Sequence, residues 1–289
     1  MSLFQNSVQQ KYLNLLDAKL VDAKYTEFKS YFGNPDIQEN IRNSKEEQFQ
    51  EGFLRELFVK ILGYTLNPSS NFNLTTEYKN VKDSKKADGA ILTFDKGACS
   101  LAEGFLVVGV IELKGTNTTD LSKIEAQAFG YKNNQADCVY VITSNFEKLR
   151  FYIDNAIEFI EFNLFNLNRS NFDLLYLCLS YENIAKGIPK TIKTESVSHE
   201  DIITKQLYKD YSQFKSELHH NLVSQNPQFD VLTIFKKSQK LLDRFLFLFF
   251  AEDRQLLPPN SVRLILNDWK DLQDRDVDIP LYHRFKKIL

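Results

Sequence analysis

Three charged side chains near the middle of the chain have types and spacing that could support hydrolysis of a phosphodiester bond. Asp88 precedes one apolar run, and Glu112 and Lys114 stand two positions apart at the end of another. Two carboxylates beside a lysine form an oxygen-rich site of the kind that Mg²⁺ prefers. A bound divalent ion polarises a phosphate and lowers the pKa of a bound water, while a lysine can orient that water or offset developing negative charge.

The surroundings of the Glu112–Lys114 pair distinguish it from similar pairs. An acidic residue followed two positions later by Lys also begins at Asp17, Asp22, Glu27, Glu77, Asp83 and Asp268. Only the pair at Glu112 lies in a strongly apolar run, where the period-two alternation of a strand places both charges on one face. Burial of charge is unfavourable unless the charges are paired or bind a metal. The alternatives are therefore a structural ion pair and a metal-assisted catalytic site.

The elements around these residues predict a mixed α/β fold. Helical spacing of apolar residues covers residues 5–32, 44–63 and 118–133, and Ser44 with Glu47 three positions later predicts a helix N-cap. Short β-type runs cover residues 73–78, 87–94, 105–115, 138–144, 148–152 and 157–162. A hairpin of the second and third runs would bring Asp88 alongside Glu112. The order of helices and strands predicts a mixed sheet flanked by helices.

The second part of the chain has a different pattern. No strand is predicted after residue 171, and residues 186–198 combine Gly, Pro, Lys, Thr and Ser with few large apolar side chains. Helical spacing returns over residues 199–224, 231–253 and 259–271. We therefore expect an α/β domain over residues 1–185 and an all-helical domain over residues 186–289.

Composition restricts the class of protein. The chain has 289 residues, of which 43% are hydrophobic and 26% charged, as in ordinary globular proteins. Its formal charge of -2 lacks the basic excess of many nucleic-acid binders, so any DNA contact must be local. Cys99, Cys138 and Cys178 share no metal-type spacing, which predicts a reducing compartment, the cytoplasm. No segment resembles a signal peptide or a membrane span.

Two further groups of residues could serve the same centre. Gln127 and Tyr131 are four positions apart and share one helical face, although such pairs are also common on ordinary helices. Four lysines crowd the approach to Asp88 and could either contact DNA phosphates or form a solvated loop. They are Lys79, Lys82, Lys85 and Lys86.

The combined pattern resembles the PD-(D/E)xK nuclease superfamily. An Asp that opens one hairpin strand, Glu-x-Lys in the next and a following helix with Gln-x-x-x-Tyr are similar to its branches with a Gln-x-x-x-Tyr helix, although Ala87 replaces the usual Pro. The resemblance implies a restriction-endonuclease-like core that binds Mg²⁺, with Mn²⁺ as a substitute. It implies that the metal ligands are Asp88, Glu112 and the backbone carbonyl of Leu113.

The resemblance also implies roles for other residues. Lys114 would be the catalytic lysine, Gln127 an orienting residue and Tyr131 a DNA contact. Many members supply a further carboxylate from the first core helix, for which Glu47 is favoured slightly over Glu51. The activity implied is cleavage of double-stranded DNA by in-line attack of a metal-activated water, which leaves 5′-phosphate and 3′-hydroxyl ends.

A longer resemblance involves the helical part of the chain. Residues 61–64 and 242–258 are similar to the N-terminal region of type IIG restriction-modification enzymes, which join a nuclease through a helical connector to an adenine methyltransferase and a target-recognition domain. This chain has no Gly-rich methyl-donor loop and no Asn-Pro-Pro-Tyr-like motif, so we expect a fragment or a truncated copy. A charged cluster would either dock the absent methyltransferase or form intrahelical ion pairs. It contains Asp243, Arg244, Glu252, Asp253 and Arg254.

Two other functions fit the same sequence. The chain could be a non-catalytic DNA-binding or interaction module that keeps the fold, or a structural subunit whose helical part docks a partner. Binding of a divalent ion at Asp88 and Glu112 distinguishes the nuclease from both.

Overall fold

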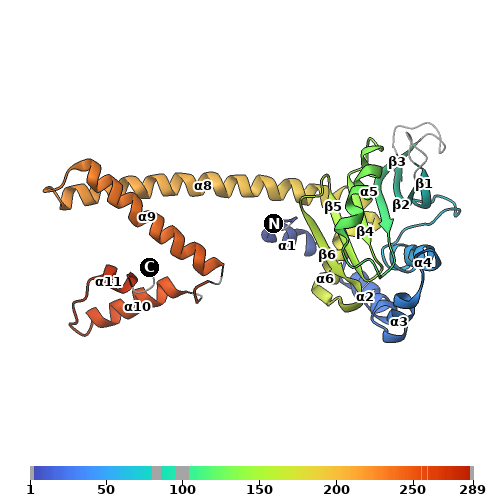
Figure 1. Cartoon of the computed structure of the whole chain (residues 1–289), viewed down its shortest axis with the longest axis horizontal. Coiled ribbons are helices and arrows are strands. Elements are labelled where there is room, and N and C mark those ends of the chain that lie inside the picture. The colour runs from blue at the N-terminus through green and yellow to red at the C-terminus, as the bar shows by residue number, and fades with distance from the viewer. Residues whose placement is uncertain (1–2, 80–85, 95–103, 255, 259, 287–289) are drawn as a thin grey trace. The chain divides into compact units, whose positions relative to one another are not determined.

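The computed structural model describes residues 3–79, 86–94, 104–254, 256–258 and 260–286 (Figure 1). The chain forms two compact units, Met1–Asp201 and Ile202–Leu289, which are called unit 1 and unit 2 below. Unit 1 contains the whole β-sheet, and the described part of unit 2 is helical. The order of an α/β part and a helical part is as predicted, but the units meet at residues 201 and 202 and not at the predicted 185 and 186.

Unit 1 begins with helices α1 (Asn6–Leu13), α2 (Ala18–Phe32), α3 (Pro35–Asn43) and α4 (Glu46–Phe53), and α4 continues as the π-helix η1 (Leu54–Ile61). The sequence prediction missed α3, although its start carries a recognisable signal. The Asn34 side chain accepts a hydrogen bond from the Asp36 N–H, and Pro35 occupies the first turn, where a missing N–H is harmless.

Six strands form one mixed sheet, and all six predicted β-type runs are confirmed. The strands are β1 (Leu74–Lys79), β2 (Lys86–Phe94), β3 (Phe105–Leu113), β4 (Tyr140–Ser144), β5 (Lys148–Ile153) and β6 (Phe159–Asn163), and they lie side by side in chain order. Every neighbouring pair is antiparallel except β3 and β4. Parallel neighbours need a crossover connection, which contains helix α5 (Ser122–Asn133).

Helices cover both faces of the sheet. On one face, Ile111 and Leu113 of β3 belong to a large core with Phe53 of α4 and Phe172 of α6 (Arg169–Leu179). On the other face, α5 packs on β3 and β4, and Figure 1 shows it in front of these strands. The central strands are apolar because both of their faces are covered.

Residues 186–198, whose composition predicted the domain boundary, are helical from Ile188 onward. After η2 (Leu164–Asn166), α6 and α7 (Tyr181–Ala185), helix α8 runs over Ile188–Gln225 and spans the boundary at Asp201. Gly187, with φ +68°, follows α7 in the left-handed conformation that glycine tolerates, and Pro189 lies in the first turn of α8. The Gly and Pro that suggested a linker are therefore helix-end residues.

Unit 2 contains the second part of α8 together with α9 (Val231–Asp253), α10 (Ser261–Gln273) and α11 (Leu281–Phe285). Asp230 caps α9 by accepting a hydrogen bond from the Thr233 N–H at 2.9 Å. The small core of this unit includes Ile234, Leu248 and Phe285. Among the helices that the structure describes, none has the length and apolarity to cross a membrane.

We expect Phe53→Ala to destabilise unit 1 by about 3–5 kcal/mol, because truncation of a buried phenylalanine leaves a cavity. Phe53 is fully buried and its ring contacts Phe32, Phe58 and Phe146. Urea denaturation followed by circular dichroism measures the change. Ile157→Ala is the matched control, because Ile157 is 85% exposed, and an equal effect of both substitutions would contradict the described core.

Candidate active site

Asp88 and Glu112 come together where strands β2 and β3 end their pairing. The register pairs Gly89 with Ile111, and its continuation by one residue places Asp88 opposite Glu112. Side chains directly opposite each other in such a pair have Cβ atoms about 4.5–5.5 Å apart. The Leu113 N–H donates to Asp88 Oδ2 at 2.7 Å, so the carboxylate side chain takes up the backbone group at the end of the ladder.

Lys114 connects the carboxylates of this site. Its Nζ donates to Glu112 Oε1 at 2.9 Å, to Glu46 Oε1 at 3.2 Å and to the Leu113 carbonyl at 2.8 Å. The predicted placement of Glu112 and Lys114 on one face is thus confirmed. The site thus contains one ammonium group and three carboxylates, those of Glu112, Glu46 and Asp88. It carries more negative than positive charge when all of them are ionised.

The glutamate that helix α4 contributes is Glu46, and neither Glu47 nor Glu51 lies at the site. Besides its contact with Lys114, Glu46 Oε2 accepts a hydrogen bond from the Gly115 N–H at 3.3 Å. Glu47 is exposed, and Glu51 forms an exposed ion pair with Arg55. This corrects the sequence prediction, which favoured Glu47.

The error has a physical cause in the start of α4. The prediction placed the N-cap at Ser44, whereas the N-cap is Lys45, whose N–H donates to Gln48 Oε1 at 2.9 Å. The apolar face of this helix includes Phe49 and Phe53, and its continuation toward the N-terminus at helical spacing reaches Glu46. Helical periodicity therefore indicated Glu46, whereas the apparent capping motif drew attention to Glu47.

A second polar residue of α4 was also missed. The Gln50 side chain lies one turn after Glu46 and donates from Nε2 to Asp88 Oδ1 at 3.3 Å and to Glu46 Oε1 at 3.3 Å. Both oxygens of Asp88 thus have partners, one from the backbone of β3 and one from α4.

Burial and the charge of Asp88 perturb Glu112. The side chain is 1% exposed, and its Oε2 has no hydrogen-bond partner among the residues that the structure describes. Burial, followed by repulsion from Asp88, raises the pKa of Glu112 to about 7. Burial also raises the pKa of Asp88. Burial would lower the pKa of Lys114, but its hydrogen bond to Glu112 and the surrounding carboxylates raise it overall.

The donor set fits a hard divalent cation. Glu112 Oε1, Glu46 Oε1 and the carbonyl of Leu113 all accept from Lys114 Nζ, and Asp88 accepts from the Leu113 N–H. Glu112 Oε2 is a buried oxygen without a partner among the residues that the structure describes. Within the described ranges, no three His, Cys, Asp or Glu side chains already form a group able to hold a metal ion. Mg²⁺ usually keeps several waters and needs only one or two carboxylates.

Helix α5 places Gln127 and Tyr131 on one face, as predicted, since Gln127 Nε2 donates to the Tyr131 hydroxyl at 3.0 Å. The charges of Glu112 and Asp88 add to burial in raising the pKa of Tyr131, which places this side chain near the carboxylates. However, Tyr131 is 4% exposed and packs in the core between α5 and the sheet. Its ring is therefore a core element, not an open DNA-contact surface.

The four lysines predicted to approach DNA have different outcomes. Lys79 and Lys86 are exposed Cα partners in strands β1 and β2, and Lys86 forms an ion pair with Glu77 at 2.8 Å. Lys82 and Lys85 lie outside the described residues. The strands thus place two exposed cations close in sequence to Asp88.

The predicted charged cluster of unit 2 is used mainly within its own unit. Glu252 Oε1 accepts a hydrogen bond from the Asn260 N–H at 2.6 Å, Arg244 donates to the Tyr282 hydroxyl, and Arg254 lies over the Phe250 ring. Asp243 accepts a hydrogen bond from Gln239. None of these four contacts is an ion pair, so they bear out neither the predicted intrahelical ion pairs nor a docking role.

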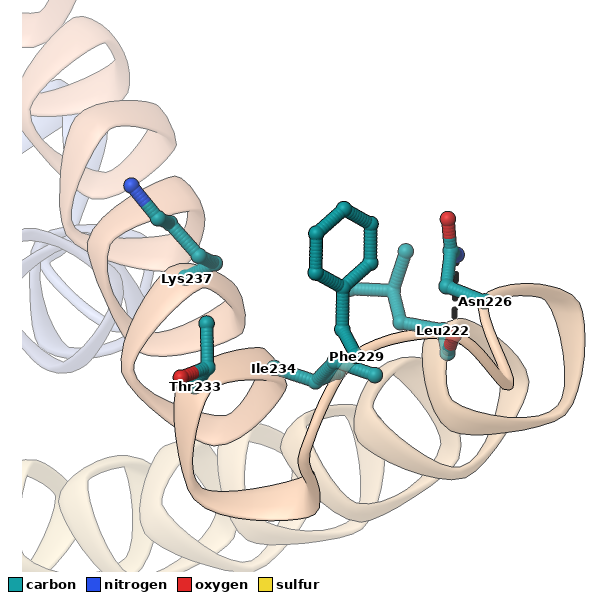
Figure 2. A pocket seen from close by; sticks show the side chains of 6 residues that line it. All are labelled: Leu222, Asn226, Phe229, Thr233, Ile234 and Lys237. Atoms are coloured by element: carbon teal, nitrogen blue, oxygen red, sulfur yellow. Dashed lines mark hydrogen bonds between the residues drawn. The ribbon is translucent and has the colours of Figure 1, made fainter.

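Other features of the described residues lack comparable chemistry. Figure 2 shows an apolar cavity of about 230 Å³ in unit 2, with Phe229, Ile234 and Lys237 among its lining residues and no carboxylate. Cys138 and Cys178 are buried free thiols, and burial raises the pKa of Cys138 to about 12, far from the range of a reactive thiolate. Cys99 lies outside the described residues.

Comparison with models of known protein families, with curated protein sequences and with solved structures finds no match for this chain. A functional assignment therefore depends on the geometry and chemistry of the site itself.

We expect the stability of the metal-free protein to fall as the pH rises from about 4.5 through about 7, because the folded state favours protonated Glu112. Glu112→Gln removes this dependence and should make unit 1 more stable than wild type by up to about 3 kcal/mol near pH 8, with little difference near pH 4.5. Urea denaturation in the presence of EDTA measures both proteins. Glu47→Gln is the exposed control, and identical pH profiles for wild type and Glu112→Gln would contradict the described burial.

Proposed function

We propose that unit 1 is a divalent-metal-dependent endonuclease domain of the PD-(D/E)xK type, which hydrolyses phosphodiester bonds of double-stranded DNA. The observation that carries this proposal is the convergence of Asp88, Glu112 and Lys114 from adjacent strands, beside Glu46 from the preceding helix. The mixed sheet and the crossover helix α5 after the Glu-x-Lys strand are compatible with that family.

The residues of the site would divide the chemical work as follows. Asp88 is held in place by the Leu113 N–H and Gln50, and Glu112 offers a carboxylate oxygen that has no hydrogen-bond partner among the described residues. A bound Mg²⁺ or Mn²⁺ would supply electrophilic activation of the phosphate and a more acidic water. Lys114 Nζ, which already contacts carboxylate oxygens, would orient the attacking water or offset negative charge on the phosphate. The products would carry 5′-phosphate and 3′-hydroxyl ends.

The chemistry of the ligands supports Mg²⁺ over zinc. The carboxylates of Asp88, Glu112 and Glu46 and the carbonyl of Leu113 offer oxygen, whereas protein zinc sites usually include histidine or cysteine. Mn²⁺ accepts similar oxygen ligands and should substitute.

We further propose that the chain is the nuclease and connector portion of a cytoplasmic restriction enzyme of the type IIG kind. In that arrangement, sequence choice and DNA methylation would belong to a separate methyltransferase and target-recognition region. The motif pattern and the succession of an α/β unit and a helical unit support this assignment.

A non-catalytic module is the second candidate, and one observation favours it. Lys114 pairs with both Glu112 and Glu46, so the charges could form a structural ion-pair cluster that needs no metal. The two candidates differ in whether removal of a carboxylate changes binding of a divalent ion.

Plasmid nicking in Mg²⁺ or Mn²⁺ tests the proposal. We expect Asp88→Ala, Glu112→Ala and Lys114→Ala each to lower the rate by about 10²-fold or more, because each removes a group that would act on the reacting phosphate or its ion. Glu46→Gln should slow nicking, whereas the neighbouring Glu47→Gln should not, since Glu46 contacts Lys114 and Glu47 is exposed. EDTA should abolish the reaction.

Calorimetric titration of Mn²⁺ into the same proteins decides the outcome if the wild type does not nick DNA. Binding by the wild type that disappears in Asp88→Ala and Glu112→Ala supports the metal site. Absence of binding, or equal binding by all three proteins, would contradict the proposal and favour the non-catalytic module. Circular dichroism confirms that each variant is folded.

A further inference from the structure

A second surface, on unit 2, has a composition suited to binding a polyanion. Two adjoining cavities of about 340 and 440 Å³ share Lys240, Arg244 and Tyr282 as lining residues. Lys237 extends the lining on one side and Lys286 on the other. These five residues define what is called the α9 groove below.

The secondary structure explains how the cations come together. Lys237, Lys240 and Arg244 are spaced three and four positions apart in α9 and therefore share one helical face. The Arg244 guanidinium donates to the Tyr282 hydroxyl of α11. Phe285, which is buried, packs edge-on against Phe245 of α9 with ring centroids 5.2 Å apart. This contact holds the end of α11, and with it Lys286, beside the three cations of α9.

The cations of the groove lack anionic partners within the part of the chain that the structure describes. Lys237, Lys240, Arg244 and Lys286 form no ion pair there with a described carboxylate, and Asp243 is the one acidic residue among the lining residues. Like charges three and four positions apart disfavour a helix slightly. An external polyanion would relieve that repulsion.

The dimensions and walls of the groove favour a nucleic-acid backbone. Lys237 and Arg244 are seven positions apart in an α-helix, a rise of about 10 Å. About 10 Å along the axis of duplex DNA corresponds to roughly three phosphates of one strand. Phe247, which is 61% exposed, and Tyr282 add ring faces that can pack against sugars or bases.

We propose that the α9 groove binds the phosphate backbone of DNA as a contact surface separate from the Asp88–Glu112 site. The choice of DNA as the polyanion rests on the proposed function of unit 1, whereas the preference for a phosphate backbone rests on the groove alone. Contacts of this kind position a protein on DNA without reading its sequence, which suits a connector unit.

Salt-dependent DNA binding tests the groove. The full chain is titrated into a fluorescein-labelled duplex of about 20 base pairs in EDTA, at about 50 to 200 mM salt, and anisotropy is measured. The variant Lys237→Gln/Lys240→Gln/Lys286→Gln leaves the Arg244–Tyr282 contact intact. We expect at least about tenfold weaker binding and a slope of log K against log salt that is smaller by about 2 to 3, because each phosphate contact contributes about 0.9.

The matched control is Lys205→Gln/Lys209→Gln/Lys270→Gln, which removes the same charge from exposed lysines of unit 2 outside the groove. It should bind DNA within about twofold of wild type, because it keeps the lysines of the α9 groove. A nonspecific effect of net charge would instead weaken both triple variants equally. Equal losses in the two variants, unchanged binding in the groove variant, or no DNA binding by the wild type would overturn the inference. So would groove-dependent binding to phosphatidylserine vesicles in place of DNA.

The two proposals fail independently in this experiment. Asp88→Ala should retain groove-dependent DNA binding, because Asp88 lies in unit 1 and contributes nothing to the groove. If the protein neither nicks DNA nor binds metal but still shows groove-dependent DNA binding, the nuclease proposal is removed and this inference stays in place. If nicking is normal and the groove variant binds DNA as tightly as the wild type, the α9 groove inference is removed and the nuclease proposal stays in place.

Discussion

The repulsion between Asp88 and Glu112, opposed mainly by Lys114, is the constraint around which the sheet end of unit 1 is organised. Two carboxylates at opposite positions of an antiparallel pair destabilise a sheet when both are charged. Here one of them is almost fully buried, so water cannot screen it. Three groups offset that repulsion. The Leu113 N–H of β3 donates to one oxygen of Asp88, Gln50 donates to its other oxygen, and Lys114 neutralises part of the charge of Glu112.

The same constraint explains why the neighbouring helices need to be fixed. Glu46 and Gln50 reach the site from α4, whose opposite end is anchored in the core by Phe53 and η1. Helix α5 closes the other face with Tyr131. A site that binds a metal ion gains affinity when its ligands are held in place before the ion arrives, since less ordering remains to be done on binding. In the proposed nuclease, the large aromatic core of unit 1 would therefore support metal binding as well as stability.

The sequence was most informative where one periodicity decided the outcome. Strand alternation and the hairpin were sufficient to predict that Asp88, Glu112 and Lys114 converge. The sequence failed where two signals competed, as at Ser44 and Glu47, whose capping pattern concealed that the helical face leads to Glu46. The prediction of the domain boundary also failed at Gly187 and Pro189, because glycine and proline are common both in loops between domains and at helix ends.

Contacts between elements distant in sequence were beyond pattern analysis. Burial of Tyr131 depends on how closely α5 approaches the sheet, which spacing within α5 does not specify. In unit 2, the spacing of Lys237, Lys240 and Arg244 is visible in the sequence, but the docking of α11 that brings Tyr282 and Lys286 to them is a tertiary event.

The most direct test of the central claim is a crystal of the wild-type protein soaked in Mn²⁺ and measured for anomalous scattering. We expect an anomalous peak between the carboxylates of Asp88 and Glu112, with the Leu113 carbonyl nearby and Glu112 Oε2 as a ligand. Absence of a peak at this position at saturating Mn²⁺, with Lys114 still bridging Glu112 and Glu46, would contradict it and identify the cluster as a structural ion pair.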